Sequence, residues 1–155
     1  MALDLKMPAD GPNWLMACMA FETGETFSPS VRNGAGSGAV GLIQFMPATA
    51  KGLGTSTAHL ADMTAEEQLD FVHRYFLPYK GKLSRLSDVY MAILWPAAIG
   101  KPDTAPLWDA ATRPTTYRQN SGLDANKDLT ITKGEAAAKV AAKLMKGLAP
   151  NVASA

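Results

Sequence analysis

The stretch Trp14-Leu15-Met16-Ala17-Cys18-Met19-Ala20-Phe21-Glu22 decides the first element of the fold. Positions 15, 18, 19 and 22 share one helical face, so the stretch predicts a helix over residues 12–23. Glu22 therefore stands where the pattern calls for a hydrophobic residue. Burial raises the pKa of a carboxyl group, and a carboxylic acid that is protonated near neutral pH can act as a general acid. The alternative is a partly exposed glutamate at a frayed helix end, because Gly24 follows.

Working outward, we expect further helices in a mainly α fold. A helix begins at Pro47, a second runs over residues 64–77 behind a Thr64/Glu67 capping box, and a third runs over 89–99 from a Ser87 cap, kinked at Pro96. The last covers residues 133–148. No alternation of polar and apolar residues indicates a substantial sheet. The 155 residues fit a single domain, with an arm at 1–11, a core at 12–148 and a tail at 149–155.

The composition narrows the classes of function. A formal net charge of +1 argues against a nucleic-acid partner, and one cysteine, Cys18, excludes an intramolecular disulfide. No apolar run is long enough to predict stable membrane insertion. Charged residues interrupt the N-terminal stretch, so we expect no signal peptide.

The most specific string is Ser37-Gly38-Ala39-Val40-Gly41-Leu42-Ile43-Gln44-Phe45-Met46-Pro47-Ala48-Thr49-Ala50. It lacks the Lys-Ser/Thr pair of a phosphate-binding loop. Gln44 lies among apolar residues, where an unpartnered amide costs about 1–3 kcal/mol. Gln44 either fixes a turn or donates hydrogen bonds to a sugar ring or its N-acetyl group.

Glu22-Thr23, followed by Gly38-Ala39-Val40-Gly41-Leu42-Ile43-Gln44-Phe45-Met46-Pro47, resembles the soluble lytic transglycosylase domain of the lysozyme-like superfamily. The resemblance implies a lysozyme-like fold with long loops, Glu22 as the catalytic acid and Gln44 as a substrate contact. Thr23 stands where the family usually has serine. The same cleft would draw contacts from a set of residues around these motifs: Thr23, Ser37, Phe45 and Met46.

The later family motif Ala-Tyr-Asn-Ala-Gly is replaced by Ile93-Leu94-Trp95-Pro96-Ala97-Ala98-Ile99-Gly100. Trp95 either stacks on a sugar or belongs to the core. Tyr117 resembles a late active-site tyrosine of phage-type members, with a packing role as the alternative.

The resemblance predicts cleavage of the β-1,4 bond between N-acetylmuramic acid and N-acetylglucosamine in peptidoglycan, with a 1,6-anhydro product. One carboxylate suffices for that reaction, and catalysis would need no cofactor. A hydrolysing muramidase would instead need Glu25, Asp62 or another acid as a second carboxylate. A third alternative is a non-catalytic peptidoglycan-binding or structural module.

Together with the expected lack of a signal peptide, the resemblance favours a phage lysin. It would be a monomer made in the host cytoplasm, with peptidoglycan glycan strands as its partner. It would act on the cell wall as an endolysin or as a virion-associated enzyme, and an exported bacterial enzyme is the alternative.

Residues 124–135 match the twelve-residue calcium loop of EF-hands. The oxygen ligands would come from five residues of the loop: Asp124, Asn126, Asp128, Thr130 through its carbonyl group, and Glu135. Leu129 departs from the pattern, because the sixth position favours glycine. The loop predicts a structural Ca²⁺ site, or else a metal-free relic whose acids cap the last helix.

Overall fold

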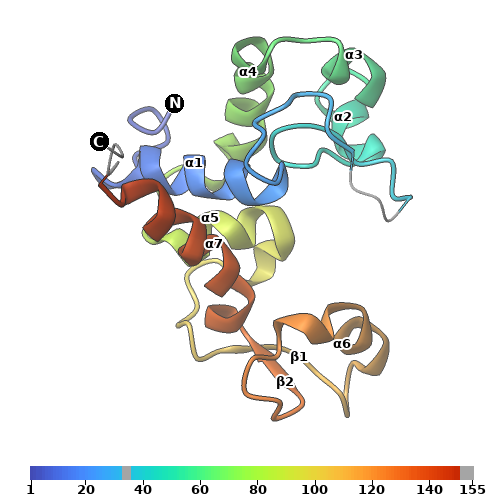
Figure 1. Cartoon of the computed structure of the whole chain (residues 1–155), viewed down its shortest axis with the longest axis vertical. Coiled ribbons are helices and arrows are strands. Elements are labelled where there is room, and N and C mark those ends of the chain that lie inside the picture. The colour runs from blue at the N-terminus through green and yellow to red at the C-terminus, as the bar shows by residue number, and fades with distance from the viewer. Residues whose placement is uncertain (33–35, 151–155) are drawn as a thin grey trace, which may run out of the picture.

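The computed structural model describes residues 1–32 and 36–150, which form helices and a two-stranded sheet (Figure 1). The elements run in the order α1 (Gly11–Glu22), α2 (Pro47–Gly52), α3 (Thr57–Ala61), α4 (Ala65–Phe76), α5 (Leu86–Leu94), β1 (Pro106–Asp109), α6 (Pro114–Asn120), β2 (Thr130–Thr132) and α7 (Lys133–Leu148). The prediction of a mainly α fold is confirmed. No helix in the described ranges combines the length and the apolar character that a membrane crossing requires.

Helix α1 packs against both α5 and α7 in the body of the molecule (Figure 1). Leu15, Cys18 and Met19 are buried on the face that the sequence predicts. Pro12 lies in the first turn, where a missing amide hydrogen costs nothing because that amide would have no partner in the helix. Burial of this apolar face therefore fixes which side of α1 faces the core.

A Schellman motif ends α1 directly after Glu22. The amide of Glu25 donates to the carbonyl of Ala20 at 2.7 Å, and the amide of Gly24 donates to Phe21 at 3.3 Å. Gly24 has a φ of +60°, which glycine adopts without steric cost. Glu22 is thus the last helical residue of a well-formed end, and the alternative of a frayed end is not what the structure shows.

Helix α4 begins with the predicted capping box. The Thr64 hydroxyl accepts from the Glu67 amide at 3.2 Å, and the Glu67 carboxylate accepts from the Thr64 amide at 2.8 Å. The buried face carries Val72 and Phe76, together with the amide side chain of Gln68. This helix therefore delivers one polar group into the core.

The predicted boundaries of the next helix are wrong, because α5 begins at Leu86 and ends at Leu94. Ser87 does not cap it, since its hydroxyl donates to Asp103 at 2.7 Å. Trp95 has a non-helical backbone (φ −155°, ψ 80°), and the helical region is disfavoured for a residue before proline. Pro96 opens a separate 3-10 turn over residues 96–98, so the helix stops where a kink is predicted.

Residues 106–132, which we call the small lobe, lie at one end of the molecule's long axis (Figure 1). Strand β1 pairs antiparallel with β2, with Trp108 opposite Ile131, and α6 contacts β1. Helix α7 follows β2 directly and returns to α1 and α5. A second capping box, formed by Thr132 and Glu135, begins α7 at this junction.

The N-terminal arm packs on the body. Leu5 is fully buried in the core, and its carbonyl accepts from the amide of Gly81 at 3.0 Å. Asp4 forms an ion pair with Lys80 and a hydrogen bond with His73 on the surface. At the other end, α7 stops at Leu148, and residues 151–155 of the predicted tail lie outside the described residues.

Candidate functional site

The carboxyl group of Glu22 is partly buried, near the side chains of Tyr75 on α4 and Tyr90 on α5. Burial raises its pKa from 4.5 to about 7, and among the described residues no donor or cation offsets this effect. The C-terminal end of a helix dipole also disfavours a negative charge. Glu22 is therefore protonated over part of the physiological range, as a general acid must be.

Tyr75 and Tyr90 are the two residues of the site that the sequence analysis misses. The Tyr75 hydroxyl donates to the carbonyl of Ala92 at 2.6 Å, which ties α4 to α5. The Tyr90 ring meets Phe21 edge to face at a centroid distance of 5.7 Å. Burial raises the pKa of both tyrosines, with a smaller contribution from the charge of Glu22, and Tyr75 reaches about 12. Both phenols therefore keep their protons.

Gln44 fixes a tight turn after the glycine-rich loop. Its backbone has a φ of +53°, and its side-chain amide donates to the carbonyls of Gly41 at 3.0 Å and Val31 at 3.2 Å. Of the two roles predicted for Gln44, the structure shows the one in which it fixes a turn. A hydrogen bond to substrate stays a prediction.

A small cavity of about 70 Å³ lies between this turn and Tyr75. Its lining includes Gln44, Met46, Tyr75 and Ile93. Tyr75 lies both at this cavity and close enough to Glu22 for the two to interact electrostatically. Tyr75 therefore lies between the Gln44 turn and the raised-pKa acid in this chain of contacts.

Gln68 holds this turn in place from inside the protein. Its side-chain oxygen accepts from the Leu42 amide at 2.7 Å, and its nitrogen donates to the carbonyls of Leu60 at 2.8 Å and Pro29 at 3.0 Å. Gly41 makes this approach possible, because a Cβ atom there would lie 2.2 Å from the Gln68 oxygen. A buried amide therefore replaces the backbone hydrogen bonds that this irregular segment lacks.

We expect Gln68→Leu to lower the free energy of unfolding by about 3 kcal/mol, because it removes three hydrogen bonds to backbone groups and leaves the buried Leu42 amide without a partner. Denaturant titration measures this loss. Gln119→Leu is the matched control, since Gln119 is an exposed glutamine on α6. Equal effects of the two substitutions would show that the Gln68 amide does not support the turn.

Thr23 is buried, and its hydroxyl is used within the fold. It donates to the carbonyl of Met19 at 2.7 Å and accepts from the amide of Phe27 at 3.0 Å. These bonds explain the residue as part of the turn that follows α1. Contact with a substrate stays a prediction.

The other residues predicted to line the cleft differ in exposure. Phe45 is buried and packs edge to face on Tyr75, whereas Met46 is 46% exposed and borders the small cavity. Ser37 is exposed, and its hydroxyl accepts from the Ala39 amide at 3.3 Å. Met46 is thus the one of these three that is both accessible and next to the cavity.

Trp95 packs against the small lobe, and Tyr117 is part of that lobe. Trp95 meets Trp108 edge to face at 5.5 Å, and the Arg113 guanidinium lies over its ring at 5.4 Å. The Tyr117 hydroxyl donates to Asp124 at 2.6 Å. The structure therefore places both side chains in packing contacts, and neither is joined to Glu22 by a hydrogen bond or ring contact.

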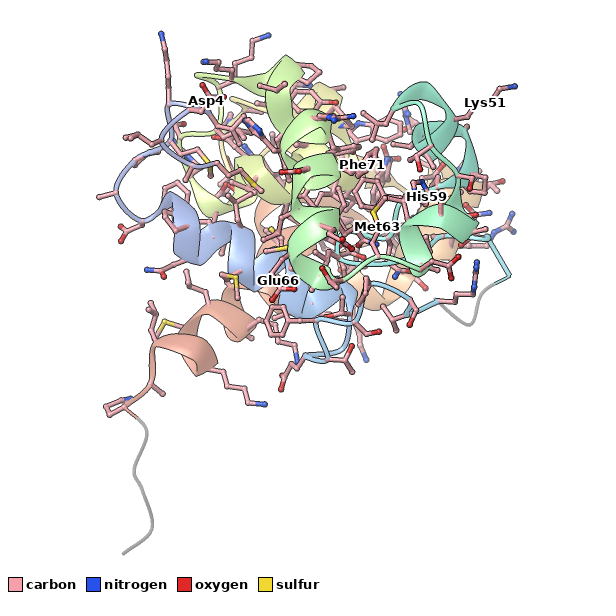
Figure 2. All side chains as sticks on the ribbon, turned by 90° about the horizontal axis from the view of Figure 1, so that it is seen from above. Asp4, Lys51, His59, Met63, Glu66 and Phe71 are labelled. Atoms are coloured by element: carbon pink, nitrogen blue, oxygen red, sulfur yellow. The ribbon has the colours of Figure 1, made fainter. Side chains whose placement is uncertain are left out.

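The two named candidates for a second carboxylate have other surroundings. Lys143 and Lys146 form ion pairs with Glu25, and their hydrogen bonds lower its pKa to about 2. Asp62 borders a different hollow of about 430 Å³. His59 and Met63, which Figure 2 labels, also line that hollow. Neither carboxylate shares the neighbourhood of Tyr75 and Tyr90.

The predicted calcium ligands lie together in the small lobe and the first turn of α7. In the described part of the chain, no three His, Cys, Asp or Glu side chains converge as a ready metal site. The carboxylates of Asp124, Asp128 and Glu135 instead accept hydrogen bonds from the loop itself.

Searches of protein-family models, curated proteins and solved structures found no match to this chain.

Proposed function

We propose that this protein is a peptidoglycan lytic transglycosylase with a lysozyme-like fold and Glu22 as its acid and base. The observation that carries the proposal is the partly buried carboxyl group of Glu22, whose pKa burial raises to about 7. The sequence resemblance supports the substrate, and the Gln44 turn beside Tyr75 supports the place of the cleft.

In the proposed reaction, Glu22 gives its proton to the oxygen of the β-1,4 bond while the bond between that oxygen and C1 of N-acetylmuramic acid breaks. The N-acetylglucosamine leaves with that proton on its 4-hydroxyl group. The N-acetyl oxygen of the muramic acid stabilises the positive charge at C1. The Glu22 carboxylate then takes the proton of the 6-hydroxyl group as its oxygen bonds to C1. The 1,6-anhydro ring closes without water, and Glu22 regains its proton.

The surroundings of the two candidate second carboxylates support a reaction that uses Glu22 alone. Inverting and retaining glycosidases position a second carboxylate within about 10 Å of the first. Here Glu25 is held by two lysines and Asp62 borders another hollow. An intramolecular nucleophile removes the need to activate water.

The resemblance to phage-type members supports one further part of the proposal, namely that the protein acts as a phage lysin on the cell wall. Its partner would be the glycan strand of peptidoglycan.

Mass spectrometry of fragments released from purified peptidoglycan tests the reaction. We expect soluble muropeptides with 1,6-anhydro ends, each one water lighter than the corresponding hydrolysis product. Fragments with reducing ends would identify a hydrolysing muramidase instead. Binding to the sacculus without release of fragments would favour a non-catalytic module.

A further inference from the structure

The loop at residues 124–135 contains one polar atom that the fold leaves unsatisfied. Asp124 is only 7% exposed, and its Oδ1 atom has no hydrogen-bond partner among the described residues. Its other oxygen, Oδ2, accepts from the Tyr117 hydroxyl at 2.6 Å and from the Leu129 amide at 3.1 Å. The contact with Leu129 directs the carboxylate across the loop, toward the sixth position. A buried carboxylate oxygen without a partner is unfavourable, and a cation would satisfy it.

Further oxygen donors lie along the same loop and at the start of α7. The Glu135 carboxylate accepts from the Thr132 amide at 2.9 Å, and the amides of Ala125 and Asn126 also help to lower its pKa. Glu135 therefore reaches back from α7 to the start of the loop. Asp128 is exposed and lies between these ends. Carboxylate, amide and carbonyl oxygens make a donor set for a hard cation such as Ca²⁺.

The backbone of the loop already makes the required turn. Leu129, at the position that favours glycine, has a φ of +68°, and its side chain is 58% exposed. The sequence departure at this position therefore does not prevent the turn. Strand β2 begins at the next residue and pairs with β1, which fixes the second half of the loop.

We propose that residues 124–135 bind one Ca²⁺ ion, with ligands from Asp124, Asn126, Asp128, Glu135 and the carbonyl group of Thr130. Three of these are carboxylates, and each accepts a hydrogen bond from a backbone amide of the loop. The ion joins the small lobe to the first turn of α7, so its role is to fix the position of the lobe. The proposal is independent of the reaction at Glu22.

Terbium luminescence of the full-length protein tests the site directly. Tb³⁺ takes the place of Ca²⁺ and emits when a nearby aromatic ring transfers energy to it. Tyr117, which donates a hydrogen bond to Asp124, supplies that ring. We expect saturable emission on addition of Tb³⁺, reversed by Ca²⁺ but not by the same concentration of Mg²⁺. Thermal denaturation should show a melting temperature that rises with Ca²⁺.

Glu135→Gln and Asp128→Asn should each weaken Tb³⁺ binding at least about ten-fold. Both replacements keep the shape of the side chain, and glutamine can still complete the capping box, so the metal-free fold is retained. Glu66→Gln is the control, because Glu66 is an exposed carboxylate on α4, far from this loop in the chain (Figure 2). Absence of saturable emission, equal affinity in the loop variants and wild type, or equal displacement by Mg²⁺ would overturn the proposal.

Discussion

Glu22→Gln should lower the rate of peptidoglycan cleavage by about 10²–10⁴-fold, the usual contribution of a positioned general acid and base. Glutamine has nearly the same shape but cannot give or take the proton at neutral pH. The wild-type rate should fall as the pH rises through about 7, because the Glu22 proton is then lost before reaction. Measuring the release of soluble muropeptides over a pH series checks both statements.

The same substitution should make the protein more stable at about pH 8. Burial raises the pKa of Glu22 above its ordinary value of 4.5, so the folded state favours the protonated form. Below pH 4.5 the group is protonated in both the folded and the unfolded state and adds no cost. Between pH 4.5 and about 7, Glu22 ionises in the unfolded state but stays largely protonated in the folded state, so the free energy of unfolding falls. A rise from 4.5 to about 7 corresponds to about 2–3 kcal/mol after allowance for partial exposure.

Denaturant unfolding at about pH 4 and pH 8 tests the expected change in stability. The variant and the wild type should agree at the lower pH, and the variant should be more stable at the higher one. Glu25→Gln is the control, because lysines lower the pKa of Glu25 and its stabilising effect is present at neutral pH. It should keep its activity and gain no stability. If Glu22→Gln were fully active, the assignment of the acid would be wrong.

The sequence predicts the position of Glu22 because that prediction depends on one helix. The apolar stripe, the proline at the start and the glycine after the end all lie within fifteen residues, and the helix forms as expected. The Thr64 capping box is local in the same way. Tyr75 and Tyr90 are different, because only the packing of α4 and α5 near α1 brings them to Glu22. Their sequence positions look like ordinary aromatic sites on amphipathic helices.

The errors in the sequence analysis have the same origin. Ser87 has the right chemistry for a helix cap, but Asp103, sixteen residues away, takes its hydroxyl group. Gln44 is correctly identified as an amide that needs partners. The turn is also supported by Gln68, whose hydrogen bond to the Pro29 carbonyl joins residues 39 positions apart in the chain. A pattern within one segment cannot reveal which distant group will satisfy a polar side chain.

Asp88 and Lys133 form a long-range ion pair in the core. Both side chains are fully buried, and they join α5 to the start of α7. Asp88 also accepts from the Gly100 amide at 2.8 Å and from the Ser84 hydroxyl at 3.0 Å. Burial alone would raise the pKa of Asp88, but the hydrogen bonds from Lys133, Gly100 and Ser84 together lower it. Asp88 is therefore ionised in the folded protein and compensates the buried ammonium group.

Asp88→Asn should lower the free energy of unfolding by about 3–5 kcal/mol, because it leaves the Lys133 charge buried without a counterion. Lys133→Met alone should also destabilise, since Asp88 then keeps an uncompensated charge. The double variant Asp88→Leu with Lys133→Met should recover part of the loss, because an apolar pair replaces two charges that are costly to desolvate, while the Gly100 amide and the Lys101 carbonyl lose their partners. Lys80→Met, which breaks a surface ion pair with Asp4, should have a much smaller effect. Denaturant unfolding of the wild type and these four variants tests the coupling, and a double variant less stable than either single variant would show that the two charges do not compensate each other across the core.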